Sequence, residues 1–229
     1  VLAKINGLER IRYTTSHPSD MEDSLIEVHG DTPECMPYLH LPVQSGSDKI
    51  LKSMNRNHTS ESYIYTIKKL RDVNPEIAVS GDFIVGFPGE TDEDFEETMK
   101  LVREVRYSQA YSFKFSPRPG TPASIMDNQI DEDVKSKRLQ VLQDELNRQQ
   151  LSFNKNTVGK TLPVLMERSG KKEGQIVGRS PYMQAVYVNI LNNNAGNSPD
   201  PLQGHDFLGK ICNIKIVDAG PNSLRGEMT

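Results

Sequence analysis

The chain reads GDFIVGFPGET over residues 81–91, and this stretch decides the fold. The β-rich run Ile77–Val85 predicts a strand, and the Gly-Phe-Pro-Gly turn after it ends that strand. Thr91 can cap a helix, because its hydroxyl can accept a hydrogen bond from a backbone N–H of the first turn. Three acidic residues follow it in that turn, where the helix dipole favours negative charge. A strand, a tight turn and a capped helix in succession predict one βα unit.

The rest of the first half repeats this alternation of strand and helix. The runs Arg10–Thr15, Tyr38–Val43 and Ala110–Ser116 predict three further strands. One helix is expected after Thr59-Ser60, and a longer one from Asp131 to about Asn154. Strands that alternate with helices predict parallel pairing, so we expect an α/β fold.

The second half has a different texture, with short strands separated by Gly, Pro and Asn turns. Several short strands at this spacing predict a small all-β barrel. A polar stretch from Asn192 to Gly204 predicts a mobile loop. We place the domain boundary near residue 156, which gives domains over 1–156 and 157–229. The predicted barrel strands are Leu162–Arg168, Gln175–Arg179, Ala185–Leu191, Lys210–Val217 and Ser223–Met228.

Composition indicates a soluble protein with unevenly spread charge. The 229 residues are 35% hydrophobic and 25% charged, and no run of about 18 apolar residues exists, so no membrane span is expected. The start at Val1 has no signal-peptide pattern, and we expect a cytoplasmic chain that is part of a longer protein. Residues 1–156 hold 19 Lys and Arg against 25 Asp and Glu, whereas residues 157–229 hold 8 against 6. The basic excess of the second domain is compatible with RNA contact.

Unusual polar segments follow each of the four predicted strands. In parallel βα architecture, ligands bind at the carboxyl ends of the strands, so the four segments predict one shared rim. Each segment alone also fits a structural role as a turn, a helix cap or a loop. Their joint placement makes a site the stronger interpretation. The segments are Thr15–Pro18, Gln44–Ser47, Gly86–Thr91 and Ser116–Thr121.

The residue types at this rim suit a polar ligand with a flat ring. Gln44, Ser45 and Ser47 supply short hydrogen-bonding groups. Gly86 allows close approach of the backbone to a ring, and no GK[ST] follows that would make a phosphate loop. A carboxylate inside an apolar strand needs a partner, and Asp82 has that position.

Taken together, the segments Arg10–Pro18, Leu39–Asp48, Asp82–Thr91 and Ser116–Thr121 closely resemble the radical-SAM methylthiotransferase family in residues, order and spacing. The resemblance covers essentially the whole chain. It implies part of a radical-SAM (βα) barrel over residues 1–156 and a TRAM domain, an RNA-binding β-barrel, over residues 157–229. Thr14-Thr15-Ser16-His17-Pro18 resembles the MiaB-type branch, which methylthiolates C2 of N6-isopentenyladenosine at tRNA position 37.

The resemblance also implies cofactors, partners and site residues. The intact enzyme would use S-adenosylmethionine and two 4Fe–4S clusters, with an electron donor and a tRNA anticodon stem-loop as partners. A radical formed from S-adenosylmethionine would remove the C2 hydrogen of adenine. The expected S-adenosylmethionine contacts are Ser16, Gln44, Ser45, Ser47, Asp82, Gly86, Phe87 and Arg118. The expected RNA contacts are Lys160, Arg168, Lys171, Lys172, Arg179 and Arg225.

The cluster motif CxxxCxxC of that family does not occur in this sequence. Its two cysteines, Cys35 and Cys212, are too few and too distant to hold a cluster, so we expect no cluster and no catalytic residue on this chain. Cys212 alternates with Ile214 and Ile216, which predicts a core position, and Cys35 is expected to be a loop thiol or a partly buried thiol.

Two other functions remain open from the sequence. One is methylthiotransferase action on another substrate, either threonylcarbamoyl-adenosine in tRNA or a ribosomal protein. The other is an RNA-binding module without chemistry, in which the βα part is only a scaffold.

Overall fold

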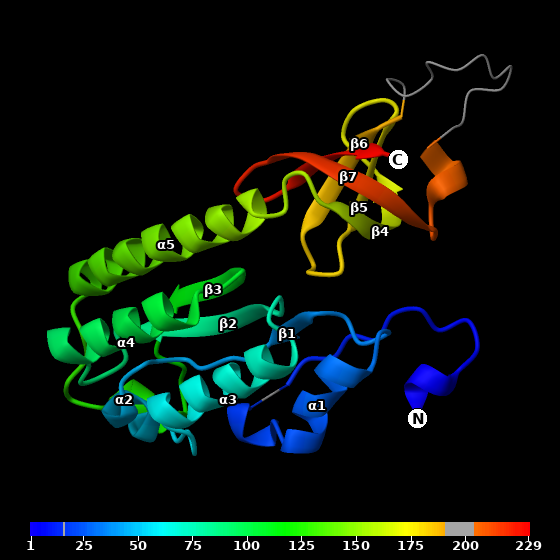
Figure 1. Ribbon diagram of the computed structural model, residues 1–229. Helices are drawn as coiled ribbons and strands as arrows, with labels where there is room; N and C mark the ends of the chain where they lie inside the picture. Colours follow the sequence, from blue (N-terminus) through cyan, green and yellow to red (C-terminus); the bar gives the residue numbers. More distant parts are fainter. Residues whose placement is uncertain (16, 191–203) are drawn as a thin grey trace, which may run out of the picture. The chain divides into compact units, whose positions relative to one another are not determined.

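The computed structural model describes residues 1–15, 17–190 and 204–229. The chain forms two compact units, Val1–Gln149 and Gln150–Thr229 (Figure 1). The division between them falls inside the long helix α5, Glu132–Lys155. The domain boundary near residue 156 stays a prediction.

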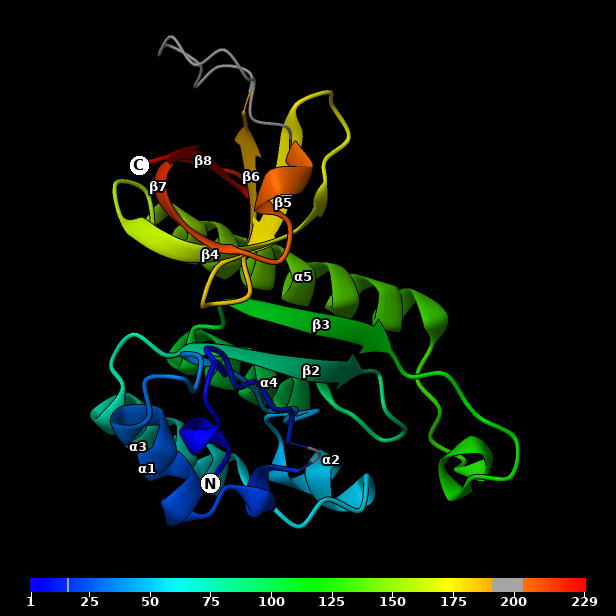
Figure 2. The same ribbon diagram turned by 90° about the vertical axis from the view of Figure 1, so that its right-hand side faces the viewer.

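A three-stranded parallel sheet forms the centre of the first unit. Its order is β1-β2-β3, and the register pairs His40 with Ser80 and Asp82 with Tyr111. Figure 2 shows β2 and β3 in front of α4 and α5, so these helices cover one face of the sheet. The predicted parallel α/β arrangement is confirmed. The strands are Tyr38–His40, Ala78–Val85 and Gln109–Lys114.

The helices begin where the capping residues predict. Thr59 and Thr91 each accept a hydrogen bond from the backbone N–H three residues later and form a capping box, which starts α3 and α4. Asn74 ends α3. The α-helices α1 to α4 span Asp23–Asp31, Asp48–Ser53, Ser60–Val73 and Asp92–Val105. Short 3-10 turns span Leu2–Lys4, Pro18–Asp20, Pro122–Ile125 and Gly204–Phe207.

Strand β2 alternates between the helix-covered core and the opposite face. Val79, Phe83 and Val85 are buried, whereas Asp82 and Ile84 between them are partly exposed. The buried side chains pack with α3, α4 and α5 in one core, in which the Tyr107 hydroxyl donates to the Tyr63 hydroxyl at 3.0 Å. The side chains on the opposite face are therefore available for a site.

The first predicted strand is wrong in its extent. Within Arg10–Thr15, only Ile11 and Thr14 form bridges, to Cys35 and His40 respectively. The partner segment contains Pro37, which has no N–H to donate and interrupts the ladder between the two bridges. The segment still lies parallel beside β1.

The second unit is a closed barrel of five strands, as predicted, and its strand order is β4-β5-β6-β8-β7. Its inward side chains include Val164, Ile176 and Ile214, all fully buried. Cys212 is partly buried and packs against this core, which agrees with its alternation with Ile214. The strands β4 to β8 are Thr161–Ser169, Gln175–Arg179, Ala185–Asn189, Ile211–Ala219 and Leu224–Met228.

Two predictions from the sequence can be compared with the structure only over the residues that it describes. The loop predicted over Asn192–Gly204 lies outside them except for Gly204, which opens a 3-10 turn. Among the described residues, no helix has the length and apolar character that a membrane span requires.

Candidate functional site

The carboxyl ends of β1 and β2 bring two of the predicted segments together. Beyond β1, the Gln44 N–H donates to the Asp82 carbonyl at 2.9 Å, and the Ile84 N–H donates to the Gln44 carbonyl at 2.9 Å. Gln44 has a positive φ of 76° and a buried side chain. The backbone turns here out of the sheet, so that the Gln44–Ser47 loop lies beside the end of β2.

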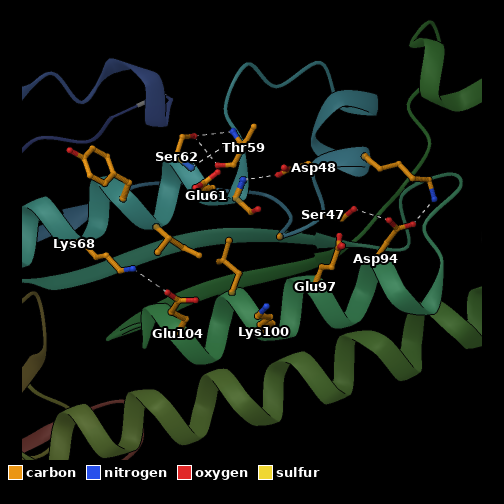
Figure 3. A pocket seen from close by; sticks show the side chains of 16 residues that line it. Ser47, Asp48, Thr59, Glu61, Ser62, Lys68, Asp94, Glu97, Lys100 and Glu104 are labelled. Atoms are coloured by element: carbon orange, nitrogen blue, oxygen red, sulfur yellow. Dashed lines mark hydrogen bonds and ion pairs between the residues drawn. The ribbon is translucent and has the colours of Figure 1, made fainter.

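The two serines of this loop bond to α4. The Ser45 and Thr98 hydroxyls are 3.2 Å apart. The Ser47 hydroxyl donates to Asp94 Oδ1 at 2.7 Å, a contact drawn in Figure 3. Both serines are fully buried. Their hydroxyls hold the loop against the helix, and their role as S-adenosylmethionine contacts stays a prediction.

Asp94 is the acceptor that joins this loop to the helix. Its carboxylate also accepts hydrogen bonds from Lys49 Nζ at 2.6 Å and from the Thr91 N–H at 2.8 Å. Burial raises the pKa of Asp94, but the hydrogen bonds from Lys49, Thr91 and Ser47 outweigh burial and lower the pKa to about 2. Asp94 is therefore ionised at neutral pH and fixes the start of α2.

The Gly86–Thr91 segment is held from the other side by α5. The Gly86 N–H donates to Glu90 Oε1 at 2.9 Å, and Arg138 Nη1 donates to the same oxygen at 2.8 Å. Phe87 is 6% exposed and packs edge-on against Phe115, with ring centroids 5.0 Å apart. The Gly89 N–H donates to the Asn128 carbonyl at 2.9 Å, which ties the segment after β3 to the same rim.

The remaining predicted cofactor contacts have different settings. Arg118 is exposed in the loop after β3, and its carbonyl accepts hydrogen bonds from Thr121. Ser16 lies outside the described residues. Asp82 lies on the sheet face that α4 and α5 leave uncovered, where its Oδ2 is 3.5 Å from His40 Nε2.

That uncovered face carries candidate site residues that the sequence analysis did not select. His40 Nδ1 lies 2.9 Å from the Ser80 hydroxyl, so Ser80 and Asp82 hold the imidazole from both sides. On β3, Tyr111 and Phe113 point to the same face and are 48% and 55% exposed. The signal that could have found them is the alternation of these aromatic residues with the small residues Ala110 and Ser112, which places both rings on one face of the strand. An aromatic surface beside a carboxylate fits the ring and hydroxyl groups of an adenosyl cofactor.

A separate pocket of about 950 Å³ lies between α3 and α4 (Figure 3). It contains Gly46 and Ser47 from the predicted cofactor loop, together with three lysines and five carboxylates. Lys68 and Glu104 are 3.8 Å apart across it. Lys49 pairs with Asp94 in the same way, and the lining keeps two more carboxylates than lysines.

The described residues offer no cluster ligand set. No group of three or more His, Cys, Asp or Glu side chains placed to hold a metal ion occurs among them. Cys35 is 5% exposed, and its sulfur lies 3.6 Å from His29 Nδ1, while His29 Nε2 lies 2.6 Å from the Tyr13 hydroxyl. Burial raises the pKa of the Cys35 thiol, so this cysteine is not a ready thiolate.

The outer wall of the barrel aligns two of the predicted RNA contacts. The registers pair Arg168 with Val177, Val177 with Tyr187, and Tyr187 with Arg225. Paired residues share a face, so two arginines and a tyrosine stand in one row across four strands. A β-bulge between Met166 and Arg168 turns Arg168 outward into this row.

The other predicted RNA contacts surround this row less regularly. Lys160, Lys171 and Lys172 are exposed at turns, whereas Arg179 is half-buried, with Nε 3.7 Å from Glu167. Lys210 and Lys215 are exposed basic residues of the same unit that the sequence analysis did not select.

Comparisons with known proteins find a match for each of the two units. The Radical SAM superfamily profile matches residues 1–102, and the TRAM domain profile matches residues 155–229. The tRNA-2-methylthio-N(6)-dimethylallyladenosine synthase of Rickettsia canadensis is 56% identical over 227 residues, which cover 99% of this chain and 48% of that protein. The synthase of the same name from Zymomonas mobilis is 54% identical over 226 residues, with the same coverage of 99% and 48%. The chain thus spans about half the length of these curated relatives.

A solved structure shares the fold at low sequence identity. Coproporphyrinogen III oxidase from Escherichia coli, described as a Radical SAM enzyme, superposes on this chain with a TM-score of 0.50 at 16% sequence identity. The superposed region covers 72% of this chain and 45% of the oxidase chain. This likeness concerns the fold alone. The two domain matches and the synthase relatives show, independently of this likeness, that the chain has a Radical SAM region and a TRAM region and is similar over 99% of its length to tRNA-2-methylthio-N(6)-dimethylallyladenosine synthases.

Proposed function

We propose that this chain forms the cofactor rim and the RNA-binding barrel of a tRNA methylthiotransferase that acts at C2 of N6-isopentenyladenosine in the anticodon loop. The observation that carries the proposal is the 56% identity over 99% of the chain, which runs through both units. The relatives are named as synthases of the corresponding methylthio nucleoside.

The first unit would bind S-adenosylmethionine on the uncovered sheet face and at the strand ends. When bound in the intact enzyme, S-adenosylmethionine supplies the radical and the methyl group. The chain's own residues bind and orient: Asp82 accepts hydrogen bonds, and Tyr111 and Phe113 offer an apolar surface for a ring. Ser80 and Asp82 keep the His40 imidazole in one orientation.

The second unit would bind the tRNA backbone. A row of two arginines around Tyr187 suits phosphate contact with one aromatic surface for a base. Adenosine in a loop can leave its stack and enter a site on another part of the protein. Affinity would come mainly from the barrel, and the choice of base from the rim of the first unit.

The test is nucleoside analysis in cells. The full-length protein is expressed in a bacterial strain that lacks its own methylthiotransferase for this base, and bulk tRNA is digested and examined by mass spectrometry. We expect 2-methylthio-N6-isopentenyladenosine to form at the expense of N6-isopentenyladenosine. An unchanged precursor would overturn the proposal, and methylthiolation of threonylcarbamoyl-adenosine or of a ribosomal protein instead would reassign the substrate. Tight tRNA binding without any product would favour the RNA-binding module.

A further inference from the structure

A buried ion pair joins α5 to the Gly86–Thr91 segment, and the proposed function does not use it. Arg138 is 7% exposed and Glu90 is 4% exposed. Arg138 Nη1 lies 2.8 Å from Glu90 Oε1, and it also donates to the Glu90 carbonyl at 3.2 Å. Arg138 Nη2 donates to Asp92 Oδ1 at 2.7 Å. One guanidinium thus binds both the side chain and the backbone of this segment.

Glu90 transmits this contact to the residue that ends β2. The carboxylate oxygen that accepts from Arg138 also accepts from the Gly86 N–H at 2.9 Å. Burial raises the pKa of Glu90, while the Gly86 amide and Arg138 act against burial. The chain of contacts therefore runs from α5 through Arg138 and Glu90 to the backbone of Gly86.

The backbone at Gly86 lies directly on α5. Gly86 has a φ of +71°, and a Cβ at this position would lie 2.1 Å from Lys135 Cγ. A glycine is needed both for this φ and for this approach. A shift of the loop toward the helix would meet the Lys135 side chain, and the Glu90–Arg138 pair opposes a shift away from the helix.

Stability alone does not account for this arrangement. Replacing a buried ion pair with well-packed apolar residues is often neutral or stabilising. Arg138 Nε is also buried without a hydrogen-bond partner among the described residues, which carries a further cost. A pair kept at such a cost is better explained by the geometry that it imposes on the loop.

We propose that Arg138 is a positioning residue for the S-adenosylmethionine site: through Glu90 it fixes the backbone of residues 86–91, against which the cofactor binds. The inference rests on the proposed function, because it concerns the same cofactor. Arg138 does not touch the cofactor, and its contribution passes through the Gly86 N–H.

The test uses the full-length protein with two readouts, the Kd for S-adenosylmethionine by equilibrium dialysis and amide hydrogen exchange over residues 84–91. Arg138→Met should raise the Kd about tenfold, because about 1.4 kcal/mol of the binding free energy would then go into ordering the loop, and should speed exchange in this segment. Arg138→Lys keeps the positive charge but loses the planar guanidinium with its several donors, so its Kd should lie between those of the wild type and Arg138→Met. Arg148→Met is the matched control on the same helix, because Arg148 is 68% exposed and pairs only with Glu145 among the described residues.

A double variant keeps the test decisive if Arg138→Met alone does not fold. Arg138→Met with Glu90→Gln removes both charges together, so no uncompensated charge stays buried. It should fold and still bind S-adenosylmethionine more weakly than the wild type. Wild-type affinity and wild-type exchange in the folded variants would overturn the proposal. If the wild type itself binds no S-adenosylmethionine, the proposed function fails, and this inference fails with it.

Discussion

Asp94 gives the sharpest prediction about the rim, because a single carboxylate holds the Gln44–Ser47 loop, Lys49 and the first turn of α4. Asp94→Asn keeps the size of the side chain but removes its charge. The folded pKa of Asp94 is about 2, against an ordinary value of 3.8. At about 1.4 kcal/mol per pKa unit, this difference stabilises the first unit by about 2–2.5 kcal/mol at neutral pH.

The pH dependence of this stabilisation has a defined sign. The folded pKa of Asp94 is depressed, so the stabilisation is fully present above the unfolded pKa and is lost as the pH falls from about 4 to about 2. The free energy of unfolding of Asp94→Asn should therefore be about 2 kcal/mol below that of the wild type at pH 7 and at pH 5. The gap should close below pH 4.

The assay must follow the first unit by itself, because the two units can unfold separately. Hydrogen exchange at increasing urea concentration, read on peptides from β2 and α4, meets this need. Glu93→Gln is the control, since Glu93 is an exposed acid in the same helical turn. A gap below about 0.5 kcal/mol at pH 7, or a gap that stays constant down to pH 2, would refute the reasoning.

Three further predictions concern the site, the RNA surface and the barrel. Asp82→Ala in the full-length protein should weaken S-adenosylmethionine binding about tenfold in equilibrium dialysis, because a charge-assisted acceptor is lost. Arg168→Ala combined with Arg225→Ala should weaken tRNA binding in a salt series and lower the salt slope by about 2, one for each phosphate contact. Gly226→Val should destabilise the barrel by about 2 kcal/mol or more in urea unfolding, because a Cβ there would lie 2.1 Å from Ile214 Cγ2.

Each of these predictions has a control and a contrary outcome. Asp82→Asn, which keeps an acceptor, should bind better than Asp82→Ala, and equal binding by the wild type and both variants would remove Asp82 from the site. Lys68→Ala, in the first unit, should leave the salt slope unchanged, and an unchanged slope in the double arginine variant would contradict the RNA row. Gly220→Ala should be tolerated, because a Cβ there meets only the Ser223 carbonyl oxygen at 3.4 Å.

Local patterns predicted most of the fold. The barrel strands follow period-two alternation, and Thr59 and Thr91 mark helix starts through their own hydrogen bonds. The exception is Arg10–Thr15, whose pairing depends on Pro37, a residue more than twenty positions away. A strand pattern describes one segment alone, whereas the hydrogen-bond ladder between two strands requires backbone donors on both segments.

The site was harder to predict than the fold, because its contacts join distant segments. Ser45 and Ser47 carry hydroxyls typical of ligand binding, but only the packed structure shows that Thr98 and Asp94 bond to them. The charge of Arg138 suggests an exposed side chain, but its place four residues before Leu142 sets it beside the apolar stripe of α5, and it is buried against Glu90. Sequence spacing shows which residues leave the sheet at the rim, and not which partners they meet there.

The edge position of β3 has a consequence for handling the isolated chain. Among the described residues, β3 pairs with β2 alone, and it carries Tyr111 and Phe113 half-exposed on one face. An open strand edge beside exposed aromatic side chains is a template for pairing with a second copy and for aggregation. Lys114 is the only charged residue within β3, so one lysine at its end opposes such pairing. Self-association of the isolated chain should therefore increase with concentration and begin at this edge.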